Sequence, residues 1–185
     1  RVDFNTKAEF EIIMSLFSAR CSDKNINLFL NLDENLPQAI NTDPLRVKQV
    51  ISNLLSNAIK FTDEGKRIEV YIDYKNNFLN VSVKDEGKGI AEDKLEHIFE
   101  SFSQEDNTTT REYGGTGLGL TISSELVELL GGELKVKSKL DIGSTFYFSI
   151  PIKIAKEVIN TDDDLKNIIF NNERIRCLRK NLNFI

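Results

Sequence analysis

Hydrophobic residues near the start of the chain recur with two different periods. Between residues 6 and 22 they recur every three or four positions, which predicts an amphipathic helix. Between residues 25 and 32 every second residue is apolar, which predicts a strand with one buried face. The apolar residues of the helical segment are Phe10, Ile13, Met14, Phe17 and Cys21.

A second helix is predicted over about residues 44–61. Asp43 can accept hydrogen bonds from the first turn, and Pro44 suits the first helical position because its missing N–H needs no partner there. One broad face of this helix is apolar and is therefore expected to face a core. That face carries Val47, Ile51, Leu54, Leu55 and Ala58.

The rest of the pattern predicts strands that alternate with two further helices. Lys75-Asn76-Asn77 is suited to a hairpin loop, and residues 103–116 are polar without a period. Half-buried strands and amphipathic helices together predict a two-layer α/β sandwich with a mostly antiparallel mixed sheet. The predicted strands are 68–74, 78–84, 133–138 and 145–150, and the predicted helices are 92–99 and 117–130.

Composition narrows the class of protein. The 185 residues carry a net charge of −5, which argues against nucleic acid as a partner. Hydrophobic residues make up 40% and charged residues 29%, as in a soluble globular protein, and the sequence has neither an apolar run of transmembrane length nor a signal-peptide pattern. The single histidine and the two widely separated cysteines exclude a zinc site, and we expect the cysteines to be reduced.

Asn53, Asn57 and Lys60 form a polar stripe on the second helix, away from its apolar face. A merely solvated stripe more often carries Glu, Lys or Gln, because Asn is a mediocre helix former. Two amide oxygens and an ammonium group would instead suit a hard cation and phosphate. Taken alone, the stripe fits either a solvated surface or a ligand site.

Two glycine-containing segments carry further candidate chemistry. Asp85 ends a predicted strand and is followed by Gly87 and Gly89, which allows either a tight turn or close approach of a flat ligand. Residues 114–120, Gly-Gly-Thr-Gly-Leu-Gly-Leu, lead into a predicted helix whose free N–H groups suit an anion. The segment is neither a Walker P-loop nor a dinucleotide fingerprint.

Taken together, these motifs give the chain a family resemblance. Over roughly residues 1–153 it resembles the ATP-binding catalytic domain of sensor histidine kinases, which has the Bergerat fold, and it looks most like the hybrid-kinase subgroup. The resemblance rests on an asparagine box, a first glycine box, a phenylalanine box, a second glycine box and a late Gly-Ser-Thr-Phe. They occupy residues 53–62, 85–90, 98–102, 115–120 and 143–146, in the family's order.

The resemblance implies roles for individual residues. Asn57 would be the Mg²⁺ ligand, Asn53 would support the metal or the phosphates, and Lys60 would offset phosphate charge; these three form the catalytic set. Asp85 would accept from the adenine amino group, with Thr145 assisting directly or through water. The stretch of about residues 100–116 would be the lid. Within it, Arg111 either reaches the phosphates or is a solvated charge, and Phe102 either anchors the lid or lies in the core, where Phe99 is expected. The other residues expected to line the ATP site are Gly87, Gly89, Ile90, Gly115, Thr116, Gly117, Leu118, Gly119 and Leu120.

The family's ATPases carry a water-activating Glu at the position of Asn53, so ATP hydrolysis is disfavoured as the purpose of this chain. We expect a protein-histidine kinase that transfers the γ-phosphate of Mg-ATP to a histidine on a separate dimerisation domain. His97, the one histidine, lacks the acceptor context and is expected at the surface or at the lid hinge. A nucleotide-binding regulatory module and a Bergerat-fold ATPase are the alternatives.

The expected partners are the dimerisation domain of the parent kinase and a response regulator or receiver domain. The 185-residue chain is expected to be a monomer, and the intact protein a cytoplasmic homodimer whose membrane anchoring through another segment is left open. The pattern changes after residue 153. Residues 154–185 are expected to be a connector followed either by the start of a degenerate receiver domain, with Asn171-Asn172 in place of the acidic pair, or by a helical tail.

Overall fold

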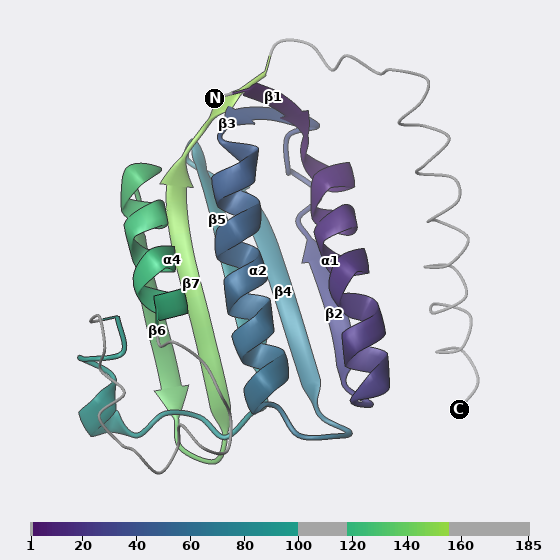
Figure 1. Ribbon diagram of the computed structural model, residues 1–185. Helices are drawn as coiled ribbons and strands as arrows, with labels where there is room; N and C mark the ends of the chain where they lie inside the picture. The colour runs from purple at the N-terminus through teal and green to yellow at the C-terminus, as the bar shows by residue number, and fades with distance from the viewer. Residues whose placement is uncertain (1, 100–117, 156–185) are drawn as a thin grey trace. The chain divides into compact units, whose positions relative to one another are not determined.

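The computed structural model describes residues 2–99 and 118–155. Three helices cover one face of a five-stranded sheet, and a small three-stranded sheet lies at one end of this sandwich (Figure 1). The compact unit ends at Ala155. The helices are α1 (Thr6–Asp23), α2 (Pro44–Phe61) and α4 (Leu118–Leu129), with a short 3-10 helix η1 (Glu92–Lys94).

The five-stranded sheet has the order β2-β4-β5-β7-β6. Only β2 and β4 pair in parallel, and α2 lies between them in sequence; the other pairs are antiparallel. This confirms the predicted two-layer, mostly antiparallel α/β fold. The strands are β2 (Asn27–Leu32), β4 (Arg67–Lys75), β5 (Phe78–Asp85), β6 (Glu133–Lys139) and β7 (Gly143–Pro151).

The small sheet has the order β1-β3-β8 and was not predicted. Its strands are too short to show a period in the sequence, and β3 is apolar at only two positions, Ala39 and Ile40. Because β8 pairs with β3, the fold extends past residue 153 to the end of this strand. The strands are β1 (Val2–Asn5), β3 (Ala39–Thr42) and β8 (Lys153–Ile154).

The core lies between the helix layer and the five-stranded sheet. The apolar face of α2 is fully buried there, and the predicted apolar face of α1, including the Cys21 thiol, is buried beside it. Along β5, Val81 and Val83 point into the core whereas Ser82 and Lys84 point to the open face of the sheet. The largest fully buried side chains include Phe10, Ile51, Leu54, Leu55, Ile68, Leu79, Phe148 and Ile150.

The length predicted for the helix over residues 92–99 is wrong. Only the 3-10 helix η1 forms, and residues 95–99 make turns. Phe99 packs against Phe146 from this segment, with ring centroids 6.5 Å apart and planes at 86°, which confirms its place beside the core.

Candidate active site

The asparagine stripe lies on α2, and its first member, Asn53, contacts α4. Asp43 Oδ1 accepts from the Arg46 N–H at 3.1 Å, so the predicted cap starts the helix. Asn53, Asn57 and Lys60 are half-buried, while the apolar face of the same helix is almost fully covered. The helix therefore presents the three polar side chains at a partly open surface.

Asn53 joins α2 to the start of α4. Its Nδ2 group donates to the Gly119 carbonyl at 3.4 Å and to Ser123 Oγ at 3.2 Å. Ser123 is fully buried, and its hydroxyl donates in turn to the Gly119 carbonyl at 2.8 Å. Because both donor hydrogens of the amide face α4, the Asn53 Oδ1 atom is left to accept or to bind a cation. Asn53 of the asparagine box thus contacts Gly119 of the second glycine box.

Asp85 is buried at the end of β5. Its Oδ1 atom accepts from the Gly87 N–H at 2.8 Å and from the Ser144 N–H at 3.3 Å. Burial raises the pKa of this carboxyl, while these two N–H groups and the charge of Lys66 pull the pKa back down. Both hydrogen bonds from described residues end on Oδ1, so Oδ2 is the oxygen available to a donor on a ligand.

Thr145 does not lie beside Asp85. In β7 the side chains alternate, so Ser144 is buried on the helix side while Thr145 lines a shallow hollow on the opposite face of the sheet. The prediction that Thr145 assists Asp85 is corrected in favour of Ser144, whose N–H reaches the carboxylate. The sequence carried the signal in Gly143-Ser144-Thr145, but the choice between neighbouring residues depends on which face each one occupies.

The first glycine box has no room for side chains at its glycines. A Cβ atom at Gly87 would lie 2.6 Å from the Phe61 carbonyl oxygen, and one at Gly89 would lie 2.0 Å from that of Lys139. Gly89 also has a φ of +67°, which L side chains rarely adopt. The Ile90 N–H donates to Ser138 Oγ at 2.8 Å, which ties the loop to β6. The loop is therefore held close against α2 on one side and the β6–β7 hairpin on the other.

Of the remaining predicted residues, some lie in the described part of the chain and others lie outside it. The Lys60 ammonium lies 4.8 Å from the centre of the Phe61 ring, His97 is exposed, and Leu118 and Leu120 are half-buried in the first turn of α4. Among the described residues, no cluster of three or more His, Cys, Asp or Glu side chains could hold a metal ion. Predicted site residues that lie outside the described residues are Phe102, Arg111, Gly115, Thr116 and Gly117.

Residues 42–154 match the family of histidine kinase-, DNA gyrase B- and HSP90-like ATPases. The chain belongs to this family. The matched range includes α2, the Asp85 loop and α4, which are the elements that meet at the site.

Its relatives are sensor histidine kinases, hybrid kinases among them. The autoinducer 2 sensor kinase/phosphatase LuxQ of Vibrio vulnificus is 42% identical over 156 residues, 82% of this chain and 18% of that protein. Hybrid signal transduction histidine kinase B of Dictyostelium discoideum is 36% identical over 97% of this chain and 9% of its own length. The chain thus spans less than a fifth of each of these relatives.

Solved structures agree with the fold. Full-length ShkA in complex with AMPPNP matches with a TM-score of 0.74 and 31% identity, over 83% of this chain and 31% of that one. The catalytic domain of histidine kinase ThkA matches with a TM-score of 0.70 and 30% identity, over 81% of this chain and 94% of that one. ThkA is also known in complex with the response regulator protein TrrA. In the described part of this chain, no helix combines the length and apolar character needed to cross a bilayer.

Proposed function

We propose that this chain binds Mg-ATP and transfers the γ-phosphate to a histidine on a separate dimerisation domain of a homodimeric parent kinase. A response regulator or receiver domain would then take the phosphate from that histidine. The observation that carries the proposal is the contact of Asn53 with Gly119 and Ser123, which brings the asparagine helix to the start of the glycine-box helix.

The base would be recognised by the Asp85 carboxylate. Its Oδ1 atom is already held by the N–H groups of Gly87 and Ser144, so the carboxylate has a fixed orientation. Oδ2 is then free to accept from the exocyclic amino group of adenine, which distinguishes adenine from a base that offers an acceptor there. Ser144 takes the supporting position that the sequence assigned to Thr145, because its N–H is the group that reaches the carboxylate.

The phosphates would lie between α2 and the N-terminus of α4. The N–H groups in the first turn of α4 have no partner within the helix and suit phosphate oxygens, and Lys60 supplies a compact cation nearby on α2. The amide oxygens of Asn57 and Asn53 fit Mg²⁺, because they are hard donors that add no negative charge beside a triphosphate. When bound, Mg²⁺ would offset the negative charge of the triphosphate.

The nucleophile would come from outside this domain. Position 53 holds an amide, which cannot act as a general base toward water, and its Nδ2 group already donates to α4. An imidazole needs no such base, because its neutral form is itself a nucleophile. The chain by itself is therefore expected to hydrolyse ATP at a barely measurable rate.

Radiolabelled ATP separates this proposal from its alternatives. The chain is mixed with Mg-ATP and a purified histidine-bearing dimerisation domain, with and without its acceptor histidine changed to Gln. We expect label on the intact acceptor domain only, in an acid-labile form. Rapid release of inorganic phosphate without labelling would indicate an ATPase, and binding without either reaction would indicate a regulatory module.

A further inference from the structure

The loop between α2 and β4, residues 62–66, is held between two other turns. On one side lies the α1–β2 turn: the Asn25 carbonyl accepts from the Gly65 N–H at 2.8 Å, and the Asn27 N–H donates to the Lys66 carbonyl at 2.9 Å. On the other side lies the Asp85 loop, where the Glu86 N–H donates to the Arg67 carbonyl at 3.1 Å. The end of α2 therefore connects α1 mechanically to the first glycine box.

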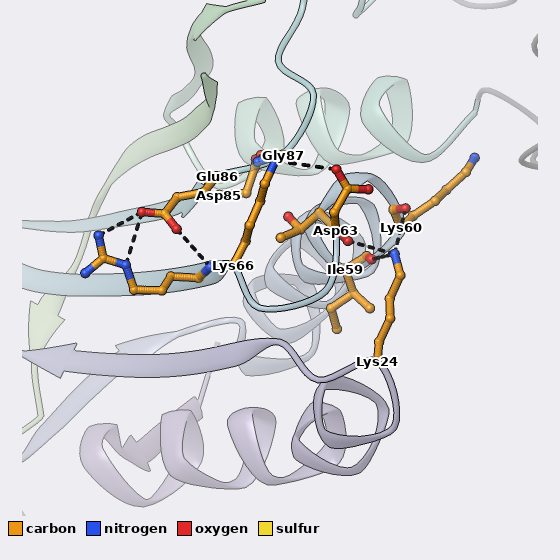
Figure 2. A network of polar contacts seen from close by, with 10 residues as sticks. Lys24, Ile59, Lys60, Asp63, Lys66, Asp85, Glu86 and Gly87 are labelled. Atoms are coloured by element: carbon orange, nitrogen blue, oxygen red, sulfur yellow. Dashed lines mark hydrogen bonds and ion pairs between the residues drawn. The ribbon is translucent and has the colours of Figure 1, made fainter. Parts of the chain in front are cut away.

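Lys24, the residue that directly follows α1, caps the C-terminus of α2. Its ammonium group donates to the carbonyls of Ile59 at 2.7 Å, Lys60 at 3.1 Å and Thr62 at 2.8 Å (Figure 2). An ammonium group has three donors, so this arrangement uses all of them. The last-turn carbonyls of a helix lack helical partners and carry the negative end of its dipole, which favours a cation there.

The remaining carbonyl in this turn, that of Phe61, is bonded to the first glycine box. The Phe61 carbonyl accepts from the Lys88 N–H at 3.2 Å, and the same oxygen would lie 2.6 Å from a Cβ atom at Gly87. Gly87 in turn donates to Asp85 Oδ1 at 2.8 Å. The carbonyls of residues 59 to 62 are thus shared between one lysine and the loop that orients the base-reading carboxylate. A shift of this helical turn would therefore move the Phe61 carbonyl to which that loop is bonded.

We propose that Lys24 is a positioning residue for the nucleotide site, and that it acts on Asp85 through the end of α2 and the Phe61 carbonyl. This inference rests on the proposed function for its effect on ATP. It differs from an ordinary helix cap, which would contribute stability alone. It also differs from long-range attraction of phosphate by charge, because the ammonium is engaged by three carbonyls.

The test compares Lys24→Met, which keeps the aliphatic stem, with Lys24→Arg, which keeps the charge but replaces the compact three-donor group by a planar fork. Lys135→Met is the matched control, since Lys135 is an exposed lysine on edge strand β6 that pairs with Glu133. Two quantities are measured on the full chain at a temperature where all variants are folded. They are hydrogen exchange of the Lys88 amide and the dissociation constant of Mg-ATP by calorimetry.

We expect Lys24→Met to speed exchange at Lys88 at least tenfold while amides of the central strand β5 stay protected, and to weaken ATP binding three- to tenfold. In Lys24→Arg, any loss of ATP affinity should be accompanied by faster exchange of the Lys88 amide. Lys135→Met should change neither the ATP affinity nor the exchange rate. Unchanged Lys88 exchange in folded Lys24→Met overturns the positioning role, even if the melting temperature falls. Normal affinity in Lys24→Arg with fast Lys88 exchange overturns it in favour of charge alone. If the wild type binds no ATP, the proposed function fails, while the Lys88 exchange still decides whether Lys24 holds the loop.

Discussion

Asp85 combines a cost to the fold with its proposed use in the site. It is buried at the end of β5, and burial raises the pKa of its carboxyl. A folded-state pKa above the unfolded value of about 3.9 means that the folded chain holds the proton more tightly. Its favourable contribution is therefore present below the unfolded pKa and is lost as pH rises through the folded pKa. At neutral pH the ionised group destabilises the fold, and such costs are common where a residue serves a ligand.

The first prediction concerns Asp85→Asn. An Asn Oδ1 atom can still accept from Gly87 and Ser144, so the variant should fold and be at least as stable as the wild type at pH 7. The stability difference, measured by urea denaturation, should shrink as pH falls through the raised folded-state pKa of Asp85 and should level off below about 4. ATP affinity should drop roughly ten- to hundredfold, because a donor would replace Oδ2 and a hydrogen bond to a charged group is worth about 1.5–3 kcal/mol.

Two results would contradict this account of Asp85. One is an unchanged ATP dissociation constant in the folded variant, which would make Asp85 a turn residue only. The other is a variant whose stability deficit grows toward neutral pH, which would mean that the ionised carboxylate stabilises the fold. Asp73→Asn provides a control carboxylate on the open face of the same sheet, where its Oδ1 atom accepts from Asn80.

The second prediction concerns Asn57→Ala. Ala is an excellent helix former, so α2 should remain intact and the thermal midpoint should change by no more than a few degrees. Loss of the amide oxygen should lower Mg-dependent ATP affinity and reduce phosphotransfer by at least about 100-fold, as for loss of a metal ligand. Transfer is measured with a supplied acceptor domain, and Asn31→Ala, an exposed change on β2, is the control. Wild-type transfer in Asn57→Ala would remove Asn57 from the site.

At the scale of elements, the β6–β7 hairpin and the Asp85 loop fit together through one glycine. Gly143 has a φ of +135°, and a Cβ atom there would lie 2.0 Å from the Asp85 carbonyl oxygen. The neighbouring Ser138 hydroxyl joins the Gly143 carbonyl at 3.0 Å and the Ser144 hydroxyl at 2.9 Å. Any side chain at position 143 must push β7 away from the end of β5.

The third prediction is that Gly143→Ala destabilises the fold by at least about 2 kcal/mol. Backbone strain alone costs about 1–3 kcal/mol, and the steric overlap of the added Cβ with the Asp85 carbonyl oxygen adds to it. It should also weaken ATP binding, because the Ser144 N–H moves away from Asp85. Gly65→Ala separates the two causes: Gly65 has a φ of +79° but no described atom within 4 Å of an added Cβ. Denaturant midpoints that fall equally in both variants would show that strain alone matters at position 143.

The elements that could be predicted from the sequence are those whose start, end and buried face are all encoded by residues of the element itself. For α2, the cap, the proline and the apolar face all lie within the helix itself, and the observed bounds match the expected ones. Strands β1, β3 and β8 have no such signal, because they are short and are stabilised by pairing with each other. The helix expected over residues 92–99 stops early, since apolar spacing there reflects contact of the turn with the core.

The same limit applies within the site. Asn53, Asp85 and Gly119 could be singled out from their motifs, and the structure brings Asn53 into contact with Gly119. Which of Ser144 and Thr145 serves Asp85 depends on strand register, a tertiary property. Lys24 meets the carbonyls of α2 across 35 to 38 residues of sequence, so no local pattern could indicate its partner.

At the scale of the whole molecule, the small sheet completes the domain. Ile152 is buried beyond the end of β7, and the Ala155 N–H donates to the Ala39 carbonyl at 3.1 Å. The fourth prediction compares a chain ended after Ala155 with a chain ended after Pro151. A chain ended after Pro151 should lose about 1.5–3 kcal/mol, the value of burying one large aliphatic side chain. Equal stability of the two truncated chains would show that the small sheet contributes nothing.

The order β1-β3-β8 places the first and last strands of the described unit on either side of one strand, β3 (Figure 1). Two strand spacings separate them, which is about 10 Å. Because both strands run antiparallel to β3, the start of β1 lies opposite Thr42 and the end of β8 opposite Ile40, so a linker must also run back along β3 and needs about a dozen residues. The chain could thus be closed into a ring there and reopened at the Asn76-Asn77 hairpin turn without cutting any motif of the site. Circular permutants of this kind would carry both new ends beside Ile152, whose N–H donates to the Asn77 carbonyl, and at the opposite end of β5 from Asp85, which is a practical place to attach a reporter.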